Sequence, residues 1–280
     1  MTIANRDQAE HWNSAEQADR WVTHQERFDR MLAPFTGMIL GAAALSAGDH
    51  VLDVGCGCGA TTLDAARAVA PGTSTGIDLS GPMLARARQN AARSAVTNAS
   101  FRQGDAQTYR FSRVVDAIIS RFGVMFFADP VAAFANLRTA VRQGGRLAFV
   151  CWQPLPANEW LTVPGGALAE HLPLPDLTDP GAPGMFALAE PGRIRSILAD
   201  SGWRDVCVTR ELTPILVGGG TLDDAVTFLR TGPLGRRVLD GVDAETQARA
   251  IDAVRTALAR HADERGVYLN AAVWLVQAGS

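Results

Sequence analysis

Three glycines alternate at positions 55, 57 and 59, between a short apolar run and a segment with helical character. The run Val51–Val54 predicts a strand, and the Ala/Thr-rich residues after Gly59 predict a helix. Glycine removes Cβ atoms where the backbone turns sharply and a ligand approaches closely. The N–H groups of the following helix point toward the same place. The pattern predicts a ligand-binding turn.

Asp53 narrows the class of ligand. The turn alone is ambiguous, because Gly55, Gly57 and Ala60 also fit the G-x-G-x-x-A fingerprint of dinucleotide binders. Asp53 lies near the end of an apolar strand, where burial of an unpaired carboxylate is costly. An ammonium group would pair with it, whereas a pyrophosphate would be repelled. The sequence favours a cationic ligand; the alternative is that Asp53 only accepts hydrogen bonds from backbone N–H groups of the turn.

Two further acids follow the next two predicted strands. Asp78 closes the second strand and can accept both hydroxyls of a ribose; the alternative role of N-cap for the next helix belongs more naturally to Ser80. Asp105 comes just after the third strand and can accept the exocyclic amine of an adenine, although Gly-Asp alone is an ordinary turn. Since parallel strands end at one edge of a sheet, the acids predict a nucleoside site there.

Strands and helices alternate over residues 50–152, as in successive βαβ units. Right-handed crossovers then place helices on both faces of a parallel sheet. The predicted strands are Val51–Val54, Thr73–Asp78, Ser100–Gln103, Val114–Ser120 and Arg146–Cys151. The predicted helices are Thr61–Ala70, Pro82–Ser94 and Pro130–Val141.

The rest of the chain divides into segments around this core, which we place at residues 48–152. Residues 1–47 are expected to form a helical lid, and residues 153–190, which lack periodicity, an inserted cap. Residues 191–280 are expected to complete the core, with a helical insertion. Within the lid, one helix is predicted because Ala18, Trp21, Gln25, Phe28 and Leu32 recur on one helix face. A second helix is predicted at Phe35–Leu45. The later elements are a helix near Gly192–Ser201, a strand near Val206–Glu211, helices from Leu222 to His261 and a strand at Tyr268–Gln277.

Charge and composition exclude several classes of protein. A formal net charge of −3 shows no basic excess, so we expect no nucleic-acid partner. The apolar runs are too short to span a bilayer, so we expect a cytoplasmic protein with reduced cysteines. All 26 basic residues are arginine, which excludes a lysine Schiff base and a P-loop lysine. We expect no metal site.

Together these motifs resemble the class I S-adenosylmethionine-dependent methyltransferases, in the bacterial branch related to the ubiquinone/menaquinone-biosynthesis methyltransferases. The matching motifs span about residues 45–152: Asp-Val-Gly-Cys-Gly-Cys-Gly at 53–59, Gly-Ile-Asp-Leu-Ser at 76–80, Gly-Asp-Ala at 104–106, Ser-Arg-Phe-Gly at 120–123 and Gly-Gly-Arg-Leu at 144–147. The resemblance implies an α/β fold with a Rossmann-like, doubly wound sheet, mostly parallel with a final antiparallel strand. Gln143 departs from the family's Pro-Gly-Gly turn, which is structural.

The resemblance also implies a cofactor, S-adenosyl-L-methionine, released as S-adenosyl-L-homocysteine. The glycine turn would cradle its methionine moiety, Asp53 its ammonium and Asp78 its ribose. Leu79 and Met83 would pack on the adenine. The residues expected to contact the cofactor are Asp53, Gly55, Cys56, Gly57, Gly59, Asp78, Leu79, Met83, Asp105, Ala106, Ser120, Arg121 and Trp21.

Methyl transfer from a sulfonium is an in-line displacement that depends on alignment and a water-poor pocket more than on a dedicated acid or base. The catalytic residue is therefore unassigned; His24 and His171 are the candidate bases, with packing or surface roles as the alternative. Trp21 is a candidate lid residue, and core packing also explains it.

The expected acceptor is a small, partly apolar metabolite, from general small-molecule metabolism or from secondary metabolism, that is methylated on carbon, oxygen or nitrogen. We also expect the protein to form a homodimer. Two rival hypotheses remain open. One is a non-catalytic S-adenosylmethionine-binding regulator. The other is an NAD(P)-dependent oxidoreductase that uses Gly55 and Gly57 for pyrophosphate.

Overall fold

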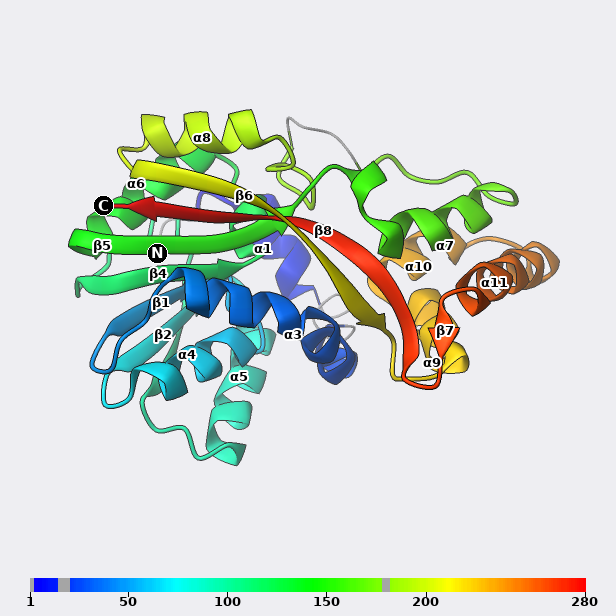
Figure 1. The fold of residues 1–280 in the computed structure, drawn as a ribbon, viewed down its shortest axis with the longest axis horizontal. Coiled ribbons are helices and arrows are strands. Elements are labelled where there is room, and N and C mark those ends of the chain that lie inside the picture. The colour runs from blue at the N-terminus through cyan, green and yellow to red at the C-terminus, as the bar shows by residue number, and fades with distance from the viewer. Residues whose placement is uncertain (1–2, 15–20, 178–181) are drawn as a thin grey trace.

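A twisted eight-stranded sheet is the centre of the computed structural model, which describes residues 3–14, 21–177 and 182–280 (Figure 1). The strand order is β3-β2-β1-β4-β5-β8-β6, with β7 paired to β8. Strands β1 to β5 pair in parallel, and β8 is antiparallel to both β5 and β6. The strands are β1 (His50–Val54), β2 (Thr73–Asp78), β3 (Ala99–Gln103), β4 (Val115–Arg121), β5 (Val141–Trp152), β6 (Arg204–Val217), β7 (Ala262–Asp263) and β8 (Gly266–Gly279).

Helices cover both faces of this sheet, with α3, α4 and α5 on one face and α6 and α8 on the other (Figure 1). The middle of β4 (117–120) and the second half of β5 (147–152) are buried between them, as the sequence's continuous apolar runs predict. The helices around the core are α1 (Arg6–Asn13), α3 (Gln25–Ala42), α4 (Ala60–Val69), α5 (Gly81–Arg93), α6 (Pro130–Ala140) and α8 (Pro191–Asp200), with a 3-10 turn η1 (Gly123–Phe126). The expected α/β fold with a final antiparallel strand is confirmed.

The strand order reverses direction between β1 and β4. The chain moves outward from β1 through β2 to β3 and then returns to β4, which pairs with β1 on its other side. In open α/β sheets, the loops after the strands at such a switch point diverge and leave a crevice for ligand. The glycine turn after β1 therefore lies at the middle of the carboxyl edge of the sheet.

The predicted break in the N-terminal helices is wrong. A single helix, α3, runs from Gln25 to Ala42 through Pro34, where the sequence predicts one helix ending near Leu32 and another starting at Phe35. Proline in a helix interior costs about 3 kcal/mol. Here Met31, Phe35 and Ile39 recur at four-residue steps and are all buried against the sheet, so packing outweighs that cost. Ala18 of the predicted helix face lies outside the described residues.

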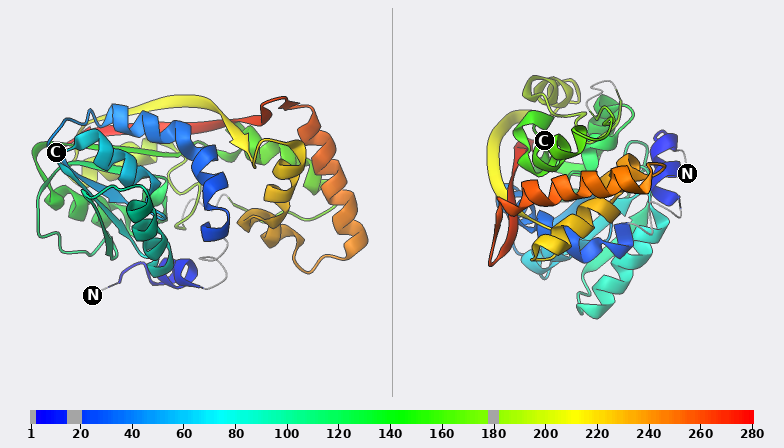
Figure 2. Two further views of the ribbon diagram at one scale, coloured as in Figure 1. Left: turned by 90° about the horizontal axis from the view of Figure 1, so that it is seen from below. Right: turned by 90° about the vertical axis from the view of Figure 1, so that its right-hand side faces the viewer.

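A group of helices lies beyond one end of the long strand pair β6–β8. β5 pairs only with residues 273–279 of β8, whereas β6 follows β8 back to Val267, so the two strands extend beyond the core. They lead to a group of helices that Figure 2 shows beyond the carboxyl edge of the sheet. These helices are α7 (Glu159–Ala169), α9 (Leu222–Thr231), α10 (Pro233–Leu239) and α11 (Ala244–Ala259), with the 3-10 turn η2 (Leu155–Ala157) ahead of α7.

Helix α7 lies within residues 153–190, the segment that lacks periodicity in the sequence. Its sequence contains Pro164, Gly165 and Gly166, which are poor helix formers, so no periodic pattern predicts it. It forms against α11, with which it shares extensive contacts. Within the described ranges, no helix is both long and apolar enough to cross a membrane.

Candidate functional site

The glycine turn connects β1 to α4, with all three glycines in the left-handed region at φ of +68°, +53° and +88° for 55, 57 and 59. A Cβ on Gly55 would lie 2.6 Å from Cα of Gly123, and one on Gly59 would lie 2.9 Å from Cβ of Ala87. Those two positions therefore require glycine for packing. Gly57 differs, since its nearest neighbours would be Met83 Sδ at 3.9 Å and Trp21 Nε1 at 4.0 Å. The turn leaves room for a ligand at Gly57.

Asp53 is buried at the end of β1, with 1% of its surface exposed. Its Oδ2 accepts a 2.6 Å hydrogen bond from the hydroxyl of Thr62, on the first turn of α4. Its Oδ1 is buried and has no hydrogen-bond partner in the described structure. Burial raises the pKa of Asp53 to about 6, against the opposing effects of the Thr62 hydrogen bond and the positive charge of Arg121. The carboxylate lacks the backbone partners that the alternative interpretation requires.

Asp78 ends β2 beside the turn and links the two. Its Oδ2 accepts a hydrogen bond of 2.8 Å from Gly57 N, and its Oδ1 accepts one of 2.8 Å from Ser80 N. Burial raises its pKa, while these backbone hydrogen bonds lower it. Ser80 is the N-cap of α5, through its hydroxyl and Met83 N, as the sequence predicts.

Asp105 is also buried, and its carboxylate binds the N-terminal segment. Oδ2 accepts from Ala4 N at 2.7 Å and Asn5 N at 2.9 Å, while Oδ1 accepts from Asn5 Nδ2 at 2.6 Å and Gln107 N at 3.0 Å. Four donors thus use the accepting capacity of the carboxylate. An adenine amine reaches Asp105 only if one of them is displaced.

The N-terminal helix α1 is docked on the loop after β2. Asn13 Nδ2 donates to the carbonyl of Leu79, Gly81 N donates to Asn13 Oδ1, and the hydroxyl of Ser80 donates to the carbonyl of Trp12. Together with Asn5, these contacts hold residues 4–13 over the carboxyl edge of β2 and β3. We call this segment the N-terminal arm.

An aromatic cluster continues from the arm into α3. Trp12 meets Trp21 and Phe126 edge to face, and Trp21 stacks on Phe28 with ring centroids 4.2 Å apart. Phe28 in turn contacts Phe228 of α9. Trp21 connects this cluster to the glycine turn, because its Nε1 would lie 4.0 Å from a Cβ at Gly57.

The end of β4 approaches the glycine turn from the other side. The hydroxyl of Ser120 donates to the carbonyl of Val54 at 2.7 Å. The guanidinium of Arg121 donates to Thr36 at 3.0 Å and to Asp29 at 3.3 Å, both on α3. Phe122 has a φ of +67° and stacks on Trp152, so the backbone is strained where β4 turns away.

The remaining predicted contacts of the adenine end are buried beside Asp78 and Asp105. Met83 and Ala106 are 4% and 7% exposed, and the carbonyl of Leu79 accepts from Gln103 and Asn13. Cys56 is buried in the turn, and burial raises the pKa of its thiol far above the usual range. It is therefore a neutral packing group.

The two histidines lie in different places. His24 is 8% exposed; its ring contacts Phe228, and burial lowers its pKa, as does the charge of Arg27. His171 follows α7, next to Leu172, which packs in a separate apolar cluster with Leu239 and Ala250. The structure thus places His24 by the aromatic cluster and His171 in the helical group.

Two residues of the site, Thr62 and Asn5, carry no signal in the sequence. Thr62 is an ordinary residue of a predicted helix, and only the turn geometry directs its hydroxyl to Asp53. Asn5 lies 100 residues from Asp105, the acid that it contacts. Such long-range pairs are a property of the folded chain.

The fold and the strand-end acids define a class, the Rossmann-like domain that binds a ligand over a glycine turn. A methyltransferase domain family matches residues 51–145. The chain is similar to that family over these residues, and it shares its overall fold with a solved methyltransferase structure.

Two curated relatives and one solved structure illustrate this similarity. Aklanonic acid methyltransferase DauC of Streptomyces sp. (strain C5) is 35% identical over 134 residues, which cover 45% of this chain and 61% of DauC. Nocamycin O-methyltransferase of Saccharothrix syringae is 30% identical over 170 residues, 57% of this chain and 60% of the relative. The chain thus spans about three fifths of the length of each.

The solved structure is geranyl diphosphate C-methyltransferase of Streptomyces coelicolor A3(2), in complex with Mg²⁺, geranyl diphosphate and S-adenosyl-L-homocysteine. It aligns with a TM-score of 0.55 at 14% identity, covering 99% of both chains. At this identity the match supports the fold alone.

Proposed function

We propose that this protein is an S-adenosylmethionine-dependent methyltransferase that acts on a small molecule. The observation that carries the proposal is the buried, unpartnered Oδ1 of Asp53 beside the open position at Gly57. An unpaired buried carboxylate oxygen is costly, and a bound ammonium would satisfy it. S-adenosylmethionine brings an ammonium together with a nucleoside, which Asp78 would hold.

The residues at the sheet edge would contact successive parts of the cofactor. Asp53 would pair with its ammonium, and the backbone around Gly57 would contact its methionine part. Asp78 would accept the ribose hydroxyls, and Leu79 and Met83 would pack on the adenine. When bound, the cofactor supplies an electrophilic methyl group on a sulfonium.

Gly55, Cys56, Gly59 and Ser120 support this site by shaping the turn and the adjoining strand end. Arg121 and Trp21 lie on either side, one bound to α3 and the other over Gly57. The assignment of the adenine edge to Asp105 and Ala106 stays a prediction. For Asp105 to contact the adenine, one of its hydrogen bonds, such as those from Ala4 N and Asn5 N, would have to break.

The protein's own contribution to the reaction would be alignment and exclusion of water. Trp21, which packs with Trp12 near Gly57, would shield the bound cofactor from water, and a water-poor site favours loss of charge from the sulfonium. Holding the acceptor in line with the methyl group supplies a large part of the rate enhancement. Where the acceptor must lose a proton, His24 is the candidate base, because its lowered pKa keeps it neutral at pH 7.

The acceptor we infer is a partly apolar metabolite, methylated on carbon, oxygen or nitrogen. The stacked rings of Trp21 and Phe28 near the turn support this inference, as do the names of the two relatives, which refer to aklanonic acid and nocamycin. A cytoplasmic location and a homodimer stay predictions.

A thermal-shift comparison tests the cofactor assignment. A ligand that binds only the folded state raises the melting temperature. We expect S-adenosylhomocysteine to raise it and NAD to leave it unchanged; the opposite result would favour the oxidoreductase hypothesis. Transfer of a labelled methyl group to compounds of a metabolite extract separates an enzyme from a non-catalytic regulator, for which no labelled product would form.

A further inference from the structure

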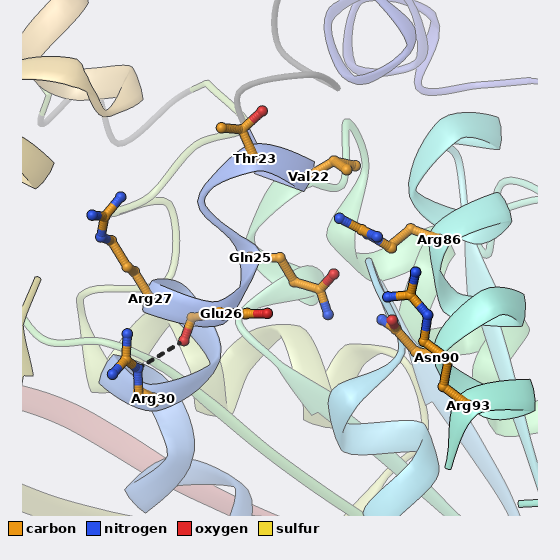
Figure 3. Close-up of a pocket in the computed structure, with 9 residues that line it drawn as sticks. All are labelled: Val22, Thr23, Gln25, Glu26, Arg27, Arg30, Arg86, Asn90 and Arg93. Carbon is orange, nitrogen blue, oxygen red and sulfur yellow. Dashed lines mark hydrogen bonds between the residues drawn. The ribbon is translucent and has the colours of Figure 1, made fainter. Parts of the chain in front are cut away.

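A basic cavity of about 400 Å³ lies between the start of α3 and the outer face of α5. Four arginines and only one carboxylate, that of Glu26, are among its lining residues, in a chain whose formal net charge is −3 (Figure 3). A concentration of guanidinium groups in one cavity produces a positive local potential. The cavity is therefore suited to an anion.

The four arginines differ in their partners. Arg27 lies 3.9 Å from Asp224, and Arg30 donates to the carbonyl oxygens of Glu26 and Gly219. Arg86 and Arg93 have no ion-pair or hydrogen-bond partner within residues 3–14, 21–177 and 182–280. In Arg86, moreover, the Nε atom is buried and unsatisfied. A buried donor without an acceptor is unfavourable, so a bound anion would remove a penalty.

Arg86, Asn90 and Arg93 lie close together. Arg86, Asn90 and Arg93 follow one another at intervals of four and three residues on α5, so they share one face of the helix. Figure 3 shows them along one side of the cavity, with the Gln25 side chain pointing toward them from α3. The guanidinium groups of Arg86 and Arg93 thus lie beside two amides, those of Asn90 and of Gln25, whose Nε2 also donates to Asp29.

The cavity adjoins the proposed cofactor site. Asn90 Nδ2 donates a 3.0 Å hydrogen bond to the carbonyl of Cys58, which lies between Gly57 and Gly59 in the turn. Arg86 is one helical turn from Met83, the residue that faces Gly57. An anion held by Arg86 would therefore lie next to the turn.

We propose that Arg86 and Arg93, with Asn90, form a binding site for an oxyanion, a phosphate or carboxylate group. Arginine binds such groups through paired N–H donors, and the charge-assisted hydrogen bonds are stronger than neutral ones. The oxyanion has two sources that share this chemistry. One is a phosphate, either free or part of the methyl acceptor. The other is the carboxylate of the cofactor, and this second assignment rests on the proposed function.

Calorimetric titrations of wild-type protein, Arg86→Gln and Arg93→Gln test the site. Three probes are used: inorganic phosphate, S-adenosylhomocysteine and its decarboxylated analogue, which keeps the amine. Arg88→Gln is the matched control, since Arg88 is an exposed residue of the same helix whose Nη2 donates to the carbonyl of Phe101. Melting curves establish whether each variant folds. If Arg86→Gln does not fold, Arg93→Gln, at an exposed position, still tests the site.

For the phosphate source, we expect Arg86→Gln to weaken phosphate binding at least about tenfold. For the cofactor source, it weakens S-adenosylhomocysteine binding by a similar factor and leaves the decarboxylated analogue unaffected. Wild-type affinity of both arginine variants for all three probes would overturn the proposal. Failure of the proposed function has a different signature, since wild-type protein would then bind phosphate and not S-adenosylhomocysteine.

Discussion

The hydroxyl of Thr62 donates to one oxygen of Asp53, at 2.6 Å, and leaves the other oxygen of that carboxylate buried without a partner. The arrangement holds the carboxylate in a fixed orientation while it stays incompletely satisfied. Its folded-state pKa of about 6 reflects the cost of ionising it there. A cationic ligand would remove that cost, which connects the local geometry to binding.

Asp53→Asn separates binding from stability. The amide keeps the shape of the side chain and removes the buried charge, so we expect the variant to be at least as stable as wild type at pH 7. Cofactor affinity should fall by about tenfold or more, since a hydrogen bond to a charged group contributes about 1.5–3 kcal/mol. Melting curves and calorimetry with S-adenosylhomocysteine measure the two effects. Loss of stability with unchanged affinity would assign Asp53 a structural role.

The affinity for S-adenosylhomocysteine should depend on pH through Asp53. Its folded pKa lies above the unfolded value of 3.8, so its ionisation destabilises the folded protein as pH rises between about 4 and 6. A bound ammonium favours the ionised form. Affinity should therefore rise as pH increases toward about 6 and level off above it. Titrations from pH 5 to 7 check this slope, which should be absent in Asp53→Asn; the same slope in both proteins would exclude Asp53 as its source.

Asn5→Ala should loosen the N-terminal arm. The change removes the amide that donates to Asp105 and accepts from Ala128 N. We expect S-adenosylhomocysteine to dissociate about tenfold faster, because one charge-assisted hydrogen bond of the arm is lost. Stopped-flow dissociation measures the rate, with Asp7→Ala, an exposed change on α1, as the control. If limited proteolysis shows a released arm while dissociation stays as in wild type, the arm does not retain cofactor.

Trp21→Phe tests the aromatic cover through fluorescence. The indole lies about 4 Å from the space at Gly57 and stacks on Phe28, so a bound ligand should change its emission. We expect S-adenosylhomocysteine to alter the fluorescence of wild-type protein and to alter that of the variant much less. Affinity should change little, since phenylalanine still covers the site. A ligand signal of wild-type size in Trp21→Phe would place the cofactor elsewhere.

Much of the core follows from the sequence, because its signals are local. The five parallel strands and their helices were predicted to within a few residues by β-branched runs, the glycine turn and the prolines at helix starts. The fold class follows from their alternation. Strand ends then bring Asp53 and Asp78 to one edge, which the structure shows through the Asp78 contact with Gly57.

The parts that sequence reasoning missed depend on tertiary packing. Pro34 lies inside α3, and Pro164 inside α7, because buried contacts outweigh their poor helix propensity. Pro214 hides the true length of β6; as an edge strand, β6 tolerates a residue that donates no hydrogen bond. The contact of Asn5 with Asp105 and the cavity at Arg86 join segments far apart in the chain.

Calorimetric titration of S-adenosylhomocysteine into wild-type protein and Asp78→Ala tests the central claim, that the acids at the strand ends hold a nucleoside. We expect the variant to bind at least about tenfold more weakly while its far-ultraviolet circular dichroism stays that of wild type. The matched control is Asp64→Ala, which removes a carboxylate on the surface of α4 that, among the described residues, pairs with Arg67 alone. Equal affinity of wild type and Asp78→Ala would contradict the account.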